Sequence, residues 1–261
     1  MTPAPQQGGG PAGARGSGPG VITPDGCAVD FYALLPPGPE PGIVHAAAPL
    51  AGASILELGS GAGRVTRPLA RLGHPVVAVD ESAEMLAHIS EAETVCARIE
   101  DLALDRTFDV VLLASHLLNV ADEQIRLALL RTCARHVSPA GCVIIQYHPP
   151  GWFASASAAE RQDGGIIFRL RDVSRPAPRL LSATAEYKVG ERTWTHAFTA
   201  MRLDEEQLRS ALGEAGLRLD RYLTDDHSWL RAVPAGGGWQ RPKPAATPPV
   251  SRTCRPRSAR R

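Results

Sequence analysis

The chain has 261 residues and almost balances 28 Lys and Arg against 27 Asp and Glu, so it is long enough for one large domain with a sizeable core. No stretch approaches the roughly 18 consecutive apolar residues of a membrane helix, and the N-terminus lacks the basic-then-apolar order of a secretory signal. The five cysteines form no C-x-x-C pair and no cluster has zinc-ligand spacing, so we expect a cytoplasmic protein without a membrane segment or a metal site.

The N-terminal segment is almost entirely Gly, Pro, Ala, Gln and Ser, and we expect residues 1–26 to be disordered. Folding is expected to begin near residues 28–35. A helix over 43–50 then leads into a strand over 54–58, and a helix over 65–72 ends at a glycine.

Residues 55–63 join the first expected strand to the second expected helix with the run Ile-Leu-Glu-Leu-Gly-Ser-Gly-Ala-Gly. Glycine lets the backbone approach a ligand closely and adopt positive φ. The start of a helix offers N–H groups without intrahelical partners. The pattern therefore predicts a tight strand-to-helix turn whose amides face a ligand.

The spacing of the glycines disfavours a dinucleotide as that ligand. The dinucleotide motif G-x-G-x-x-G uses its third glycine to pack the helix against the strand. That third glycine would fall at Arg64 when counted from Gly59, and at Thr66 when counted from Gly61. A nicotinamide or flavin oxidoreductase is thus the weaker alternative.

Strands and helices are then expected to alternate up to residue 147. The strands are apolar throughout, as in a parallel sheet buried on two faces, and the alternation implies right-handed crossovers in a doubly wound sheet. Ser82 and Asp122 are suitable N-caps for the two helices. The expected strands cover residues 75–79, 94–97, 110–114 and 142–147. Cys96, Cys133 and Cys142 lie in these apolar segments and are expected to be buried thiols.

The regular alternation of strands and helices ends in the last third of the chain. Three consecutive strands over 165–173, 181–189 and 193–201 predict a small antiparallel β extension at about residues 160–201. A capping box at Asp204 and Gln207 starts a helix, followed by strands over 217–223 and 228–233. The remaining residues, 236–261, are basic and proline-rich, and we expect a solvated, disordered tail.

Two segments resemble the cofactor motifs of class I S-adenosylmethionine (SAM) methyltransferases. The run Glu57-x-Gly59-x-Gly61-x-Gly63 resembles motif I, and Val77-Ala78-Val79-Asp80 resembles the acidic end of the second strand. The resemblance covers about residues 43–148. It implies a Rossmann-like α/β domain over residues 27–235, with a doubly wound, seven-stranded, mostly parallel sheet that ends in an antiparallel strand.

The resemblance also implies a SAM cofactor and methyl transfer to an oxygen or nitrogen of a small-molecule acceptor. Asp80, or Glu81 if the strand is one residue longer, would bind the ribose hydroxyls. Ile99 would pack on adenine. The family places an acid where this chain has Arg98, so the contact to the adenine amino group would come from Glu100 or from the backbone instead. The implied cofactor-binding residues are Glu57, Gly59, Ser60, Gly61, Gly63, Arg64, Asp80, Glu81, Ile99, Glu100 and Ala114.

His116 is the candidate catalytic residue. It follows the strand over 110–114, where the resemblance places the transferable methyl group, and an imidazole has a pKa suited to proton abstraction. The alternative is a histidine hydrogen-bonded in the pocket wall. The same choice applies to His148, which follows the next strand.

Two other readings of the resemblance stay open. Amino-methylating enzymes of nucleic acids typically carry an Asn/Asp/Ser-Pro-Pro-aromatic element after the fourth strand, where this chain has Ser115-His116-Leu117-Leu118. The run His148-Pro149-Pro150-Gly151-Trp152 follows the fifth strand instead, and we interpret it as a turn. A nucleic-acid partner is therefore disfavoured, whereas a protein acceptor and a SAM-binding protein without turnover remain alternatives.

Overall fold

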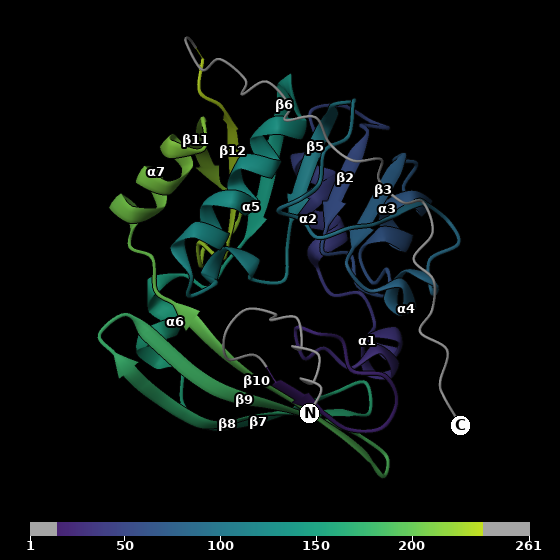
Figure 1. Cartoon of the computed structure of the whole chain (residues 1–261), viewed down its shortest axis with the longest axis vertical. Coiled ribbons are helices and arrows are strands. Elements are labelled where there is room, and N and C mark those ends of the chain that lie inside the picture. The colour runs from purple at the N-terminus through teal and green to yellow at the C-terminus, as the bar shows by residue number, and fades with distance from the viewer. Residues whose placement is uncertain (1–14, 237–261) are drawn as a thin grey trace, which may run out of the picture.

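The computed structural model describes residues 15–236 and consists of two β-sheets with helices on and between them (Figure 1). Residues 1–14 and the basic tail over 237–261 lie outside the described residues, and with them most of the segments expected to be disordered. Within residues 15–236, none of the helices has the length and apolar character that crossing a membrane requires.

The larger sheet has seven strands in the order β11-β12-β6-β5-β2-β3-β4. All neighbours are parallel except β12, which pairs antiparallel with both β11 and β6. This confirms the predicted doubly wound sheet with an antiparallel strand near its end. The bounds are β2 Ile55–Leu58, β3 Val76–Asp80, β4 Glu93–Cys96, β5 Phe108–Leu113, β6 Val137–Gln146, β11 Leu217–Tyr222 and β12 Trp229–Pro234.

Helices cover both faces of this sheet. The apolar side chains of α5 and α7 pack on one face and those of α2 and α3 on the other, in two separate cores. The predicted caps are confirmed: Ser82 caps α4, Asp122 caps α5, and Asp204 forms a capping box with Gln207 on α7. The bounds are α2 Glu40–Ala47, α3 Thr66–Arg71, α4 Ala83–Leu86, α5 Glu123–His136 and α7 Glu205–Glu214.

The smaller sheet is antiparallel, has five strands in the order β1-β10-β9-β8-β7, and is larger than the predicted extension. Strand β1 lies in the segment expected to be disordered, and its pairing with β10 orders it. Pro149 and Pro150 start helix α6 instead of a turn, because proline fits the first helical position. The bounds are β1 Arg15–Ser17, α6 Pro150–Ser155, β7 Ala159–Asp163, β8 Ile166–Ala177, β9 Leu180–Val189 and β10 Arg192–Met201.

Helices α1 (Val29–Leu34) and α6 lie between the two sheets (Figure 1). Phe31 of α1 stacks on Tyr187 of β9 with ring centroids 4.1 Å apart. On its other side, α1 packs Val29 against Ala62 of the glycine loop and Met85 of α4. Helix α1 therefore ties the small sheet to the loop in which the sequence places the ligand.

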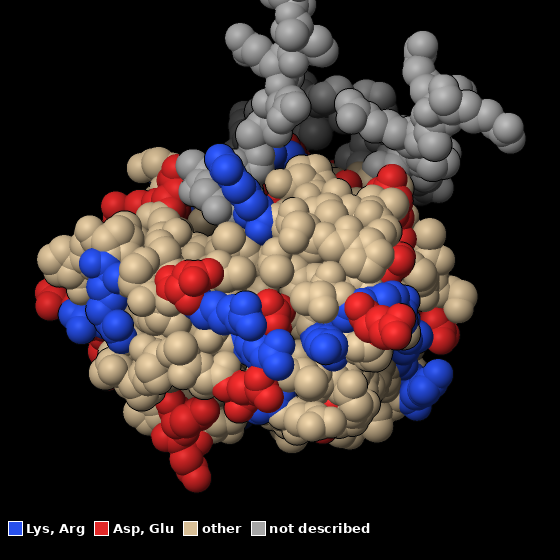
Figure 2. Space-filling model, turned by 90° about the horizontal axis from the view of Figure 1, so that it is seen from below, with Lys and Arg blue, Asp and Glu red and all other residues tan. Residues whose placement is uncertain are grey.

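The outer side of the small sheet carries charges of both signs, scattered among other residues (Figure 2). Arg169 pairs with Glu160 at 2.5 Å and with Glu186 at 2.8 Å. A face that alternates in sign does not present the one-signed surface that nucleic-acid backbones attract.

Two of the three cysteines that were predicted to be buried thiols are confirmed. Cys133 and Cys142 are buried free thiols. Cys96 differs, since it is half-buried and disulfide-bonded.

Candidate active site

The main sheet changes direction between β2 and β5: the chain runs outward from β2 to β3 and β4, and then returns to β5 on the other side. In such sheets ligands bind beyond the carboxyl ends of the strands at this switch point. Two loops leave the sheet there, residues 59–65 after β2 and residues 114–119 after β5.

Backbone hydrogen bonds hold the first loop against the end of β3. Gly59 N and Ser60 N both donate to the Val79 carbonyl at 2.9 Å. Gly61 N donates to Asp80 Oδ2 at 2.8 Å. Gly59, Gly61 and Gly63 have φ of +74°, +54° and +82°, a region that favours glycine. The predicted tight turn is confirmed.

The three glycines have different surroundings. A Cβ on Gly61 would meet no atom within 4 Å, so the backbone there faces open space. A Cβ on Gly59 would lie 2.9 Å from Leu117, and one on Gly63 would lie 2.7 Å from Ile89. Gly61 is thus the position exposed to a ligand, whereas Gly63 is required for packing against the segment after α4.

Asp80 holds two backbone amides. Its Oδ2 accepts from Gly61 N, and its Oδ1 accepts from Ser82 N at 2.9 Å. Burial raises the pKa of this carboxyl, and the two amides oppose that effect. An ionised carboxylate offers about four lone-pair sites, so Asp80 retains acceptors for a further donor such as a sugar hydroxyl.

Glu57 lies buried at the middle of β2 and accepts from the hydroxyl of Thr66, with an Oγ1–Oε2 distance of 2.6 Å. Burial raises its pKa to about 7, while Thr66 and the charge of Arg64 act in the opposite direction. The contact ties the strand to the first turn of α3. Glu57 therefore stabilises the shape of the glycine loop from beneath.

Arg64 forms an ion pair with Glu40 of α2, with 2.7 Å between Nη1 and Oε1. The other carboxylate oxygen, Glu40 Oε2, is buried and has no hydrogen-bond partner. Glu40 was not predicted as a site residue, because nothing in the local pattern around residues 38–42 connects it to a loop more than 20 residues away.

His116 and His148 lie face to face after β5 and β6. Their ring centroids are 3.7 Å apart, and Trp152 of α6 stacks on the other side of His148, also at 3.7 Å. Burial lowers the pKa of His116 to about 4, against opposing effects of the Tyr147 backbone and Glu40. Burial and the neighbouring His116 lower the pKa of His148 to about 2. Both imidazoles are neutral at physiological pH.

The backbone that carries His116 is strained. Ser115 and His116 have φ of +56° and +58°, two consecutive non-glycine residues in the left-handed region. Each such residue costs on the order of 1 kcal/mol or more and persists only where its surroundings enforce it. The turn directs the His116 ring toward the end of β6, where it stacks on His148.

Asn119, which was not predicted as a site residue, enforces this arrangement. Its Nδ2 donates to the carbonyls of Met201, at 2.9 Å, and His148, at 3.3 Å. Its Oδ1 accepts from His148 N at 2.7 Å. One buried amide therefore joins the loops after β5 and β6 to the end of β10.

Some buried polar atoms here lack hydrogen-bond partners. Among the described residues, four buried side-chain polar atoms have no hydrogen-bond partner, and three of them are Glu40 Oε2, Ser60 Oγ and His116 Nδ1. Ser60 lies in the glycine loop and Glu40 pairs with Arg64 of that loop. His116 lines a cavity of about 500 Å³ together with His148 and Trp152.

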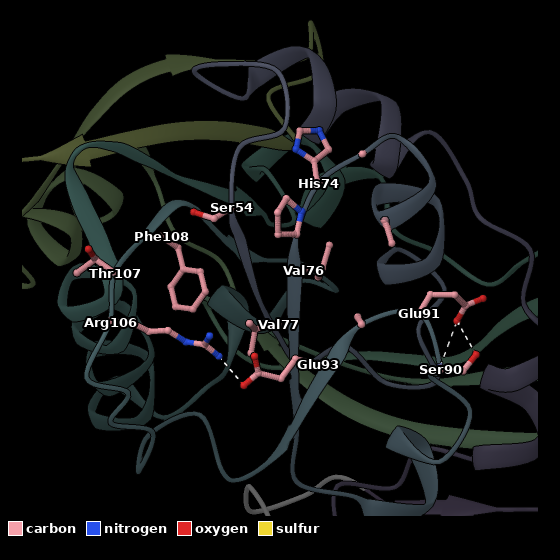
Figure 3. A pocket seen from close by; sticks show the side chains of 14 residues that line it. Ser54, His74, Val76, Val77, Ser90, Glu91, Glu93, Arg106, Thr107 and Phe108 are labelled. Atoms are coloured by element: carbon pink, nitrogen blue, oxygen red, sulfur yellow. Dashed lines mark hydrogen bonds and ion pairs between the residues drawn. The ribbon is translucent and has the colours of Figure 1, made fainter.

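A larger cavity of about 660 Å³ lies at the amino ends of the strands, on the opposite edge of the sheet (Figure 3). Arg106 points toward Glu93 there, at 2.5 Å, and His74 lies apart from this pair. Neither cavity is lined by glycine-loop residues, but the smaller one is lined by the loops after β5 and β6, at the carboxyl ends of the strands. Over residues 15–236, no group of three or more His, Cys, Asp and Glu side chains is arranged to hold a metal ion.

Comparison with known proteins agrees with this geometry. Residues 55–141, from β2 through α5 into β6, match the family model described as a methyltransferase domain. Residues 55–141 therefore form a methyltransferase domain. The match begins at the strand before the glycine loop and includes both Asp80 and His116.

Curated relatives match this methyltransferase domain over part of their length. The cypemycin N-terminal methyltransferase of a Streptomyces species is 34% identical over 149 residues, which is 52% of this chain and 61% of the relative. The ubiquinone biosynthesis O-methyltransferase of Nitrobacter winogradskyi is 34% identical over 100 residues, 35% of this chain and 37% of the relative. The matched part thus spans less than two thirds of these relatives.

Solved structures share the fold over most of the chain. A SAM-dependent methyltransferase from Clostridium acetobutylicum superposes with a TM-score of 0.64 at 15% identity, covering 79% of this chain and 95% of that protein. The CcbJ methyltransferase of Streptomyces caelestis also gives 0.64, at 21% identity, with coverages of 80% and 96%.

The methyltransferase domain brings most of the predicted cofactor residues to one edge. Ile99 and Leu117 flank Gly59, since a Cβ there would lie 3.8 Å from Ile99 and 2.9 Å from Leu117. Ala114 is buried directly after β5. Glu100 pairs with Arg98 at 3.0 Å.

Glu81 lies at the rim of this edge and is more exposed than Asp80. Partial burial of its carboxylate and the neighbouring charges of Asp25 and Asp80 raise its pKa, while the charge of Arg98 opposes them. Asp80 accepts a hydrogen bond from Gly61 N in the glycine loop, and Glu81 lies one residue beyond it. This favours Asp80 over Glu81 as the residue that faces the ligand.

Proposed function

We propose that this chain transfers the methyl group of SAM to an oxygen or nitrogen of a small-molecule acceptor. The observation that carries the proposal is the glycine loop itself, whose backbone is open at Gly61 and is held by a hydrogen bond to the Asp80 carboxylate. The names of the relatives support it, since they include an N-terminal methyltransferase and O-methyltransferases.

Each part of SAM would have residues to hold it at this edge of the sheet. Asp80, with acceptor capacity beyond its two amide partners, would bind the ribose hydroxyls. Ile99 and Leu117 would enclose adenine, with Glu100 at its edge. The methionine end would lie over Gly61, where Ser60 Oγ is free to bond and Arg64 supplies a positive charge for a carboxylate.

SAM supplies a methyl group that its sulfonium already activates, so the protein's contribution is positioning and exclusion of water. The glycine loop and Asp80 fix the donor side. His116 is neutral because burial lowers its pKa to about 4. Its ring can therefore accept a hydrogen bond from the O–H or N–H group of the small molecule that is to be methylated. Alignment of this kind lowers the barrier without an obligatory general base.

The small sheet would form the acceptor side of the site. Helix α1 joins it to the glycine loop, and Asn119 joins its strand β10 to the loops that carry His116 and His148. Acceptor specificity is therefore expected to reside in this sheet, in α6 and in the loops after β5 and β6.

Calorimetric titration with SAM and with NAD tests the proposal. The wild-type chain is expected to bind SAM and not NAD. The Gly61→Arg variant fills the open space above the loop and is expected to abolish SAM binding. Gly190→Arg is a matched control, because Gly190 has φ of +59° against +54° for Gly61, and its Cβ would also meet no neighbour. NAD binding, or SAM binding that survives Gly61→Arg, would refute the assignment.

A further inference from the structure

We propose that the cavity beside His116 and Trp152 holds the methyl acceptor, and that Asp226 at its rim selects an acceptor that carries a positive charge, such as a protonated amine. The inference rests on the proposed function and deepens it by naming the chemical class of the acceptor. It also adds the turn between β11 and β12, residues 223–228, to the elements that contact the acceptor.

The cavity lies next to the glycine loop. His116 lines it, and the next residue, Leu117, lies 2.9 Å from where a Cβ on Gly59 would be. His148 and Trp152 continue the lining at the end of β6 and on α6. The volume of about 500 Å³ falls within the roughly 300 to 1,000 Å³ of small-molecule sites. A molecule in this cavity would therefore lie beside a cofactor bound on the glycine loop.

Three stacked rings form one wall of the cavity. The ring of His148 lies between those of His116 and Trp152, with centroids 3.7 Å apart on both sides and interplanar angles of 10° and 11°. Asn119 Oδ1 accepts from the His148 backbone N and so fixes the middle of the stack. Trp152 is half-buried, and among aromatic side chains tryptophan attracts cations most strongly. The wall therefore suits a ligand with a positive charge.

The turn between β11 and β12 holds a carboxylate at the rim of the same cavity. Asp226 Oδ1 accepts from the backbone N of Ser228 at 2.9 Å and from its hydroxyl at 2.7 Å. The Ser228 carbonyl accepts from Tyr147 N at 2.9 Å, which ties the turn to the end of β6. Both contacts from Ser228 end on one oxygen of Asp226, so an ionised carboxylate with about four lone-pair sites retains acceptors for a ligand.

Asp226 determines the charge of the cavity. Among the described residues that line it, Asp226 is the only one whose side chain is charged at neutral pH, since both histidines are neutral. Hydrogen bonds from Ser228 and Thr224 lower the pKa of Asp226 and outweigh the opposing effect of desolvation, so its carboxylate is ionised. The carboxylate repels an anion, whereas a cation is attracted by both the carboxylate and the ring wall.

The test measures binding of benzylamine and benzyl alcohol by calorimetry to protein loaded with S-adenosylhomocysteine, at low ionic strength. The two probes share the ring and differ in charge. Asp226→Asn removes the charge and keeps an oxygen that accepts from Ser228, so the turn is expected to keep its shape. Asp225→Asn is the matched control, because it removes the same charge from the neighbouring exposed residue, which does not line the cavity. Trp152→Leu removes the outer ring of the wall.

We expect benzylamine to bind wild type about fivefold or more tightly than benzyl alcohol. Asp226→Asn should weaken benzylamine about threefold or more and leave benzyl alcohol unchanged, and Asp225→Asn should change neither. Trp152→Leu should weaken both probes, because both lose the ring contact. All three variants should bind S-adenosylhomocysteine as wild type does.

Equal binding of the two probes to wild type, or no binding of either, would overturn the inference. Equal effects of Asp225→Asn and Asp226→Asn would also overturn it, since they would show a general effect of charge instead of a contact with Asp226. Unchanged binding of both probes to Trp152→Leu would contradict the placement of the acceptor in this cavity. If wild type fails to bind S-adenosylhomocysteine at all, the proposed function itself fails.

Discussion

Replacement of Asn119 by alanine is expected to destabilise the chain by about 3 kcal/mol. The amide makes three hydrogen bonds, at 2.7, 2.9 and 3.3 Å, and the residue is 2% exposed. Each buried bond contributes roughly 1 kcal/mol net, and the partners left behind cannot reach water. The largest single loss is expected from His148 N, a donor left without an acceptor.

Urea unfolding followed by circular dichroism measures this change, with Gln124→Ala, an exposed position on α5, as the control. We also expect the Asn119→Ala variant to lose acceptor methylation more than SAM affinity, because the His116–His148 stack depends on the amide while the glycine loop does not. A loss of stability below about 1 kcal/mol would refute the reasoning, since it would mean that the three bonds contribute almost nothing.

Two further predictions concern residues beneath and within the glycine loop. Because burial raises the pKa of Glu57 to about 7, the folded state binds a proton that the unfolded state has released, so wild type loses stability as pH rises from about 4.5 to 7. The stability of Glu57→Gln relative to wild type should therefore increase by about 2 to 3 kcal/mol between pH 5 and pH 8 in urea unfolding, and a pH-independent difference would contradict this. Gly63→Ala places a Cβ 2.7 Å from Ile89 and should cost about 1 to 3 kcal/mol more than Gly73→Ala, which has similar φ and no neighbour within 4 Å. Equal melting temperatures for the two variants would show that the packing contact is unimportant.

Local sequence patterns predicted the parts of the fold that are determined locally. The turn at Gly59–Gly63 needs positive φ, and the caps at Ser82, Asp122 and Asp204 need short polar side chains, so each is visible in a few neighbouring residues. The alternation of apolar strands with helices likewise indicated the doubly wound sheet. These features follow from backbone geometry and hydrogen bonding alone.

The parts that were missed depend on contacts between distant residues. Arg15–Ser17 has no strand pattern and becomes a strand only by pairing with β10, about 180 positions later in the chain. Glu40 and Arg64 are 24 residues apart, and Asn119 and Met201 are 82 apart. The sequence indicated His116 as a candidate residue of the site, but its stack with His148 and Trp152 requires the tertiary fold.

A crystal structure of the chain with S-adenosylhomocysteine tests the central claim most directly. We predict the sugar hydroxyls on Asp80 and the amino-acid end over Gly61, near Ser60 and Arg64. A ligand seated instead in the groove between Arg106 and Glu93, or a glycine loop closed by packed side chains in the complex, would contradict the account.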